Sequence, residues 1–95
     1  MGDAAVTEDL AFFFHRNGYV RRQNAKRLKK EKRQYKKGDE VRLVADSRAE
    51  LRTIRRLLRR AGFKAGRPFT KGNQWRQPIY GRLAVARFLT LVGEE

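Results

Sequence analysis

The chain has 95 residues, no cysteine, and 24 lysines and arginines against 10 aspartates and glutamates, for a formal net charge of +14. This length allows one small domain, and the lack of cysteine excludes disulfides and thiolate metal sites. The charge favours a polyanion, most commonly nucleic acid. No apolar run approaches the roughly 20 residues of a membrane span, and the acidic residues 1–10 are unlike a secretory signal. We therefore expect a cytoplasmic protein, associated with the nucleoid or the ribosome.

Composition divides the chain into a lead-in with a basic arm, residues 1–37, and a globular part, residues 38–95. The lead-in has phenylalanines at positions 12–14, which we expect to pack against the domain, because exposed aromatic clusters favour aggregation. The arm, residues 18–37, has Glu31 as its single acid. Like-charge repulsion opposes a stable helix there, so we expect an arm that is partly disordered and becomes helical on a polyanion. The globular part is expected to fold by itself.

The globular part opens with an alternating pattern. Residues 40–45 are rich in β-branched and apolar side chains, which is typical of a strand. Alternation places Val41 and Leu43 on one face and Arg42 on the other. The apolar face is therefore predicted to meet the core, and Arg42 to lie on the opposite face.

A helix is predicted over residues 48–61. Ser47 and Glu50 have the spacing of a capping box, and Gly62 is a favoured residue after a helix end. The helix carries apolar residues at helical spacing and six arginines. Solvated helix faces usually mix charge signs, so a face of one sign favours a polyanionic partner, with a merely solvated face as the alternative. Four arginines follow a stripe at i, i+4, i+7 and i+11: Arg48, Arg52, Arg55 and Arg59.

The remainder predicts two strands and a second helix. Residues 63–69 and 75–80 read as strands joined by a turn, and each has a proline that makes it short or places it at an edge. Residues 82–92 have helical apolar spacing. The order β-α-β-β-α predicts an α/β (α+β) fold in two layers: two helices cover one face of a small three-stranded sheet. The other face, with Arg42, stays open.

The turn between these strands is rich in glycine and basic residues. Glycines expose backbone N–H groups, and cations beside them can help such a loop hold phosphates. The segment matches no Walker or dinucleotide fingerprint. The basic residues of the segment are Arg67, Lys71 and Arg76.

Aromatic residues in the same segment allow a second kind of contact. Phe69, Trp75 or Tyr80 could stack on unpaired bases. A domain this small needs its large aromatics inside, so we expect Phe69 and Trp75 to belong to the core.

Catalysis finds little support in the sequence. His15 is the single histidine, and no triad or metal-ligand spacing appears. Asp39 and Glu40 are adjacent in a strand region and point apart, which makes a poor metal pair. We therefore expect no enzyme, no cofactor and no metal, and a small nuclease is the weakest alternative.

Four segments follow one another over about residues 18–88: GYVRRQNAKRLKKE, KGDEVRLVA, LLRRAGFKAGRPF and QWRQPIYGRLAVARF. In these segments the chain resembles the short basic signature protein family shared by the Planctomycetes, Verrucomicrobia and Chlamydiae. The resemblance implies a bacterial housekeeping protein that binds DNA and RNA unspecifically, and it implies no catalytic residue. Residues 1–17 lie outside the pattern.

The functional prediction is sequence-nonspecific binding of DNA and RNA through phosphates, by a protein that is expected to be a monomer. One alternative is a ribosome-associated protein that binds rRNA, and another is an interaction module for acidic proteins or anionic membranes. The candidate binding residues are Arg21, Arg22, Lys26, Arg27, Lys29, Lys30, Arg33, Lys36 and Lys37 in the arm, and Arg52, Arg55, Arg59, Arg67, Lys71 and Arg76 in the domain.

Overall fold

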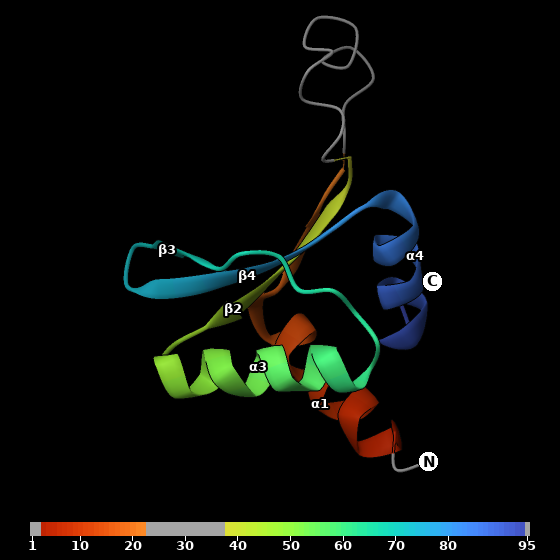
Figure 1. Ribbon diagram of the computed structural model, residues 1–95, viewed down its shortest axis with the longest axis horizontal. Coiled ribbons are helices and arrows are strands. Elements are labelled where there is room, and N and C mark those ends of the chain that lie inside the picture. Colours follow the sequence, from red (N-terminus) through yellow and green to blue (C-terminus); the bar gives the residue numbers. More distant parts are fainter. Residues whose placement is uncertain (1–2, 23–37, 95) are drawn as a thin grey trace, which may run out of the picture.

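The computed structural model describes residues 3–22 and 38–94. In these ranges the fold is α+β, as predicted: three helices accompany a four-stranded antiparallel sheet of order β1-β2-β4-β3. The elements are α1 (Asp3–Asn17), β1 (Tyr19–Arg21), β2 (Glu40–Ala45), α3 (Arg48–Arg60), β3 (Phe69–Lys71), β4 (Gln74–Tyr80) and α4 (Arg82–Leu91) (Figure 1).

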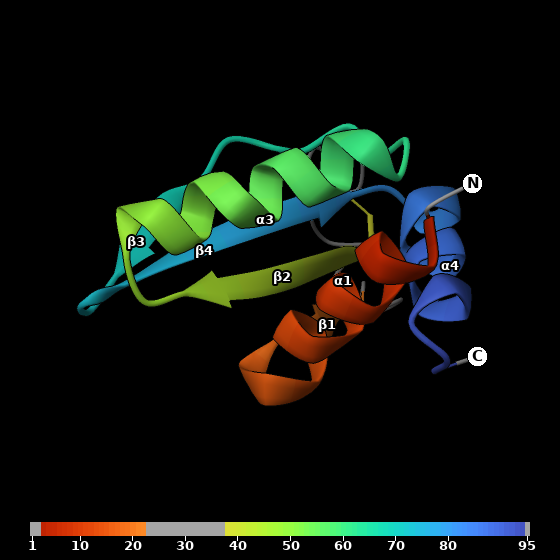
Figure 2. The same cartoon turned by 90° about the horizontal axis from the view of Figure 1, so that it is seen from below.

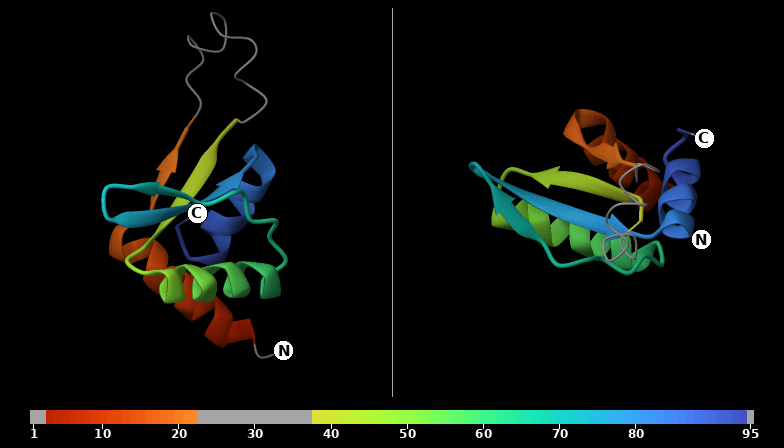
Figure 3. Two further views of the ribbon diagram at one scale, coloured as in Figure 1. Left: turned by 60° about the vertical axis from the view of Figure 1, so that its left-hand side comes forward. Right: turned by 90° about the horizontal axis from the view of Figure 1, so that it is seen from above.

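The helices lie on one side of the sheet. From below, α1 and α3 lie in front of the strands, with α4 at one end (Figure 2). From above, the strands lie in front of α3 (Figure 3). The predicted alternation in β2 explains this arrangement, because Val41 and Leu43 are fully buried and belong to the core that the helices cover. On the opposite face, no helix of the described ranges covers the strands.

Helix α3 begins and ends close to where its sequence predicts. The Ser47 hydroxyl accepts a hydrogen bond from the Glu50 amide at 3.1 Å, and Gly62 follows the helix with φ +86°. Glu50 itself accepts from the Asp46 amide at 2.8 Å, so the reciprocal bond of the capping box goes to the residue before the cap. The apolar stripe is buried on the sheet: Leu51, Ile54, Leu57 and Leu58.

The strand predicted over residues 63–69 is wrong in extent, since the ladder with β4 begins at Phe69. The preceding residues run beside β4 with one backbone bond, from the Gly66 amide to the Pro78 carbonyl at 2.9 Å. Pro68 has no amide hydrogen to donate, and side chains occupy the Gly66 carbonyl. A continuous ladder therefore cannot form over these residues.

The lead-in belongs to the folded unit and does not precede it. Val6, Leu10, Phe13 and Phe14 of α1 lie in the same core as β2 and α3. Phe13 and Phe14 pack as expected, whereas Phe12 is 59% exposed. The predicted count of three strands and two helices is therefore too low by α1 and β1.

A tight corner joins α1 to β1. The Gly18 amide donates to the Phe14 carbonyl at 2.8 Å. A Cβ on Gly18 would lie 2.9 Å from that carbonyl oxygen, which is closer than real side chains approach. Glycine therefore lets the chain turn directly from the helix into the edge strand.

The basic segment is not an N-terminal arm. Strand β1 pairs antiparallel with β2, and Arg21 lies opposite Glu40. Residues 23–37 therefore connect two neighbouring strands and are tethered at both ends. The expected conformation of this segment lies outside the described residues.

Burial of α1 leads to a stability prediction. Leu10→Ala should lower the free energy of unfolding by about 3 kcal/mol, because Leu10 is fully buried and the substitution leaves a cavity. Leu83→Ala on α4, where the side chain is 84% exposed, is the control and should change it by less than about 0.5 kcal/mol. Urea denaturation measures both variants.

The same packing reverses an expectation from the sequence. Residues 38–95 alone lack α1 and β1, so we now expect this fragment to be unfolded by circular dichroism. A cooperatively folded fragment, or a Leu10→Ala variant as stable as the parent, would contradict the role given to α1.

Candidate nucleic-acid interface

Arginines hold the acids around β2 and the start of α3. Asp39 and Glu40 are both engaged in this way. In the described ranges, no group of three or more histidines and acids is placed to hold a metal ion. The ion pairs are Arg22–Asp39 at 3.2 Å, Arg42–Glu40 at 2.6 Å and Arg16–Glu50 at 2.7 Å.

Arg16 joins α1 to the start of α3. It donates to both carboxylate oxygens of Glu50, at 2.7 and 3.1 Å, and to the Val44 carbonyl at 3.0 Å. Its guanidinium also lies over the Phe13 ring, 5.3 Å from the centroid. The hydrogen bond from Arg16 lowers the pKa of Glu50 below its usual value. Arg16 is thus a structural cation.

This ion pair makes stability depend on pH. Glu50→Gln should lower the free energy of unfolding by about 1–2 kcal/mol at neutral pH, because it removes the charge of an ion pair with two hydrogen bonds. Glutamine remains a suitable residue for the capping box. The pKa of Glu50 is lower in the folded chain than its unfolded value of about 4.3. The stabilisation is therefore present above that value and lost as pH falls through the folded pKa.

Urea titrations at neutral and acidic pH measure this effect. The difference in the free energy of unfolding between parent and variant should disappear at acidic pH. Glu8→Gln, at an exposed acid of α1, is the control and should change stability little at either pH. A gap that stays constant with pH would contradict the ionic origin of the effect.

The arginines of α3 divide into structural and exposed ones. Arg55 donates to the Gly66 carbonyl at 3.1 Å and to Gln77 Oε1 at 2.6 Å, so this candidate binding residue ties α3 to β4. Arg48 lies over the Trp75 ring at 5.8 Å. The exposed arginines are Arg52, Arg56, Arg59 and Arg60. They form no ion pair in the part of the chain that the structure describes.

The glycine-rich segment does not form the predicted phosphate loop around Gly66. The Gly66 amide is used by the Pro78 carbonyl, and the turn between β3 and β4 lies at Gly72. Arg67 and Lys71 are nonetheless exposed beside this hairpin. They can offer charge to a phosphate without the backbone cradle.

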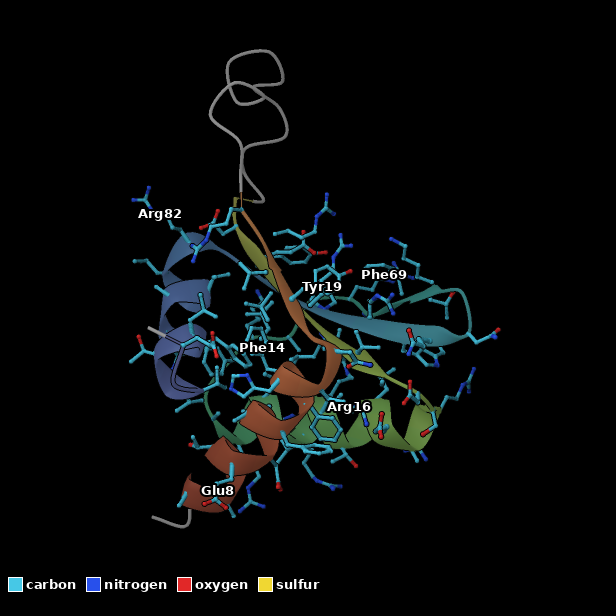
Figure 4. All side chains as sticks on the ribbon, turned by 180° about the vertical axis from the view of Figure 1, so that it is seen from behind. Glu8, Phe14, Arg16, Tyr19, Phe69 and Arg82 are labelled. Atoms are coloured by element: carbon cyan, nitrogen blue, oxygen red, sulfur yellow. The ribbon has the colours of Figure 1, made fainter. Side chains whose placement is uncertain are left out.

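The open sheet face is the side of the sheet that faces away from the helices. Register and alternation place on it residues from all four strands. Tyr19 and Phe69 lie near each other above the strands, whereas Phe14 and Arg16 lie toward the helices (Figure 4). The open sheet face consists of Tyr19, Arg21, Arg42, Phe69, Lys71, Gln74, Arg76 and Tyr80, above Glu40, Val44 and Pro78.

Tyr19 lies in a positively charged environment on this face. Burial opposes ionisation of its phenol, yet the hydrogen bonds and positive charges of Arg42 and Arg76 outweigh burial. They lower the pKa of Tyr19 below its usual value. The phenol oxygen therefore lies within reach of two guanidinium groups.

The aromatic residues of the hairpin separate between the two faces. Trp75 packs against the core, as expected, together with buried Ile79. Phe69 was expected in the core as well, and this expectation is wrong: it lies on the open sheet face under the guanidinium of Arg42. Register decides this, because Phe69 pairs with Arg76 and so shares its face.

The predicted binding residues lie in several places. Lys26, Arg27, Lys29, Lys30, Arg33, Lys36 and Lys37 lie outside the described residues. Arg21 and Arg22 are exposed where β1 meets this segment, and Arg76 is on the open sheet face. Sequence reasoning missed Arg16 and Tyr19. A signal for Tyr19 was present, since Tyr-Val-Arg after a glycine alternates like a short strand.

No family model, no curated protein and no solved structure matches this chain. The resemblance seen in the sequence therefore stays a prediction. Among the described helices, none is long and apolar enough to cross a bilayer.

Proposed function

We propose that this protein binds DNA and RNA through their phosphate backbones, without strong sequence preference. The observation that supports this most is the exposed surface of α3. Its arginines carry no counter-charge within the described ranges, and its one acid, Glu50, is held by Arg16. A same-sign helix surface costs stability in isolation, and phosphates would neutralise it while releasing counterions.

The basic segment adds to this surface. Residues 23–37 are attached at Arg22 and Gly38, next to the paired ends of β1 and β2. Its lysines and arginines therefore belong to the same folded unit as those of α3 and add to the positive charge on which the proposal rests. The family resemblance implies the same activity, and the function places the protein at the nucleoid or the ribosome.

Nonspecific binding follows from the side chains that are available. Base edges in the major groove are read best by asparagine, glutamine or arginine placed at defined points of a recognition helix. The outward surface of α3 offers arginines almost alone, which suit phosphate contacts at any sequence. The proposal therefore includes no catalytic role and no cofactor.

Salt dependence tests the electrostatic basis. If about six phosphates are neutralised, log K should fall with log salt concentration at a slope near −5 on duplex DNA. Unrelated duplexes of equal length should bind within about tenfold of one another. Fluorescence anisotropy at several salt concentrations measures both quantities. A slope near zero, or a thousandfold preference for one sequence, would refute the proposal.

A double variant tests the contribution of α3. Arg52→Gln with Arg59→Gln removes two exposed charges from the stripe and keeps helix propensity. Affinity should weaken on every sequence alike, and the salt slope should become shallower by about two units. The melting temperature should hold or rise, because like-charge repulsion on α3 is relieved.

The matched control removes the same charge elsewhere on the surface, with Lys64→Gln and Arg82→Gln. Its salt slope should change by less than about one unit. Equal changes of affinity and salt slope in the two double variants would show that the overall charge matters and not its position. Helix α3 would then not be part of the interface.

A further inference from the structure

The open sheet face carries three planar groups that pack on one another. The guanidinium of Arg42 lies 4.9 Å from the ring centroid of Phe69 and 5.9 Å from that of Tyr19. Arg42 also donates to the Tyr19 hydroxyl at 3.3 Å. The two rings and the guanidinium come from three different strands, β1, β2 and β3. We call these three side chains the stacking layer.

The stacking layer is held in place from below. Glu40 accepts from Arg42 Nε at 2.6 Å and fixes the guanidinium. Val44 beneath the layer is only 2% exposed, although no helix of the described ranges covers this face. Side chains on this face therefore exclude water from the sheet at Val44, which lies opposite Arg76. A ligand that stacks on them meets side chains that are already ordered, which lowers the entropic cost of binding.

Charge on this face selects an anionic ligand. Arg21, Lys71 and Arg76 surround the stacking layer, while the acid Glu40 is buried and engaged by Arg42. In addition, the Nε of Arg76 is buried and has no hydrogen-bond partner among the described residues. Because this atom is buried, a ligand on the face cannot reach it, and Arg76, which donates to Gln74 at 3.1 Å, offers an anion its positive charge.

We propose that the open sheet face binds unpaired bases of single-stranded nucleic acid. One or two bases stack on the stacking layer, and phosphates farther along the strand on either side lie against Arg21 and Lys71, which register places at opposite ends of the face. Every base has a flat face that stacks on an aromatic ring or a guanidinium, so this contact needs no particular sequence. The inference rests on the proposed function and adds to it a preference for unpaired over duplex strands.

Other occupants fit this face less well. A duplex hides the faces of its bases inside the helical stack, so it can offer the sheet only phosphates and groove edges. An acidic peptide would satisfy the cations but supplies few flat groups for the stacking layer. Unpaired nucleotides combine a ring and an anion in every unit, which matches both features of the face.

The test compares rings in the protein with bases in the ligand. Tyr19→Val with Phe69→Val removes both rings, keeps all charges, and uses a residue that favours strands. The probes are oligothymidylate, an abasic single strand with the same number of phosphates, and a duplex. The control variant is Phe12→Leu, which removes an exposed ring on α1, away from the sheet face. Melting curves confirm that each variant is folded.

The parent should bind oligothymidylate about tenfold or more tightly than the abasic strand, because each stacked base contributes strongly to binding. The double variant should bind both strands equally, with its duplex affinity and salt slope unchanged. Phe12→Leu should discriminate like the parent. An oligouridylate should show the same discrimination as oligothymidylate, because the rings stack on bases and not on sugars.

A parent that binds the abasic strand as well as oligothymidylate would overturn the inference and leave the proposed function standing. A folded double variant that still binds oligothymidylate tenfold more tightly than the abasic strand would have the same meaning. A parent that binds neither single strands nor duplex would overturn both proposals. If the double variant does not fold, Phe69→Val alone and the abasic comparison on the parent decide the matter.

Discussion

The short ladder between β1 and β2 is the interaction on which the rest of the molecule depends. Through it the chain before Gly38 becomes part of the sheet, and α1 comes to lie over the core. The same ladder sets Tyr19 opposite Arg42, which builds the stacking layer, and it holds both ends of residues 23–37 together. Core, open face and basic segment are thus linked by a strand of three residues.

A chain with net charge +14 has few acids with which to organise its cations, and three of them are held at structural points. Arg16, Arg22 and Arg42 each hold a carboxylate, at the start of α3, beside β2 and on the open sheet face. Arg55 is held by a carbonyl and an amide oxygen. The arginines that stabilise the fold are therefore different from the exposed ones of α3, and residue type alone cannot separate the two groups.

Local patterns predicted α3, its serine cap and the buried side of β2, because each depends on neighbouring residues. They did not predict β1, whose three residues lie in a basic context and pair only through β2. They also overextended β3, because Arg55 and Gln77, which are distant in sequence, occupy the Gly66 carbonyl. Phe69 was misplaced for a related reason. Alternation along one strand shows which residues share a face, but only the register with β4 decides which face that is.

The tethering of residues 23–37 has a consequence for the length and charge of this connection. The entropic cost of closing a connection rises slowly with its length, by about 0.6 kcal/mol for each doubling. Because the strands on either side already pair, doubling the length of this connection would add only about that amount to the cost of closing it. Under the proposed function, the number of lysines and arginines in this connection sets the affinity for a polyanion and its salt dependence, and changing that number costs little folding free energy through loop closure.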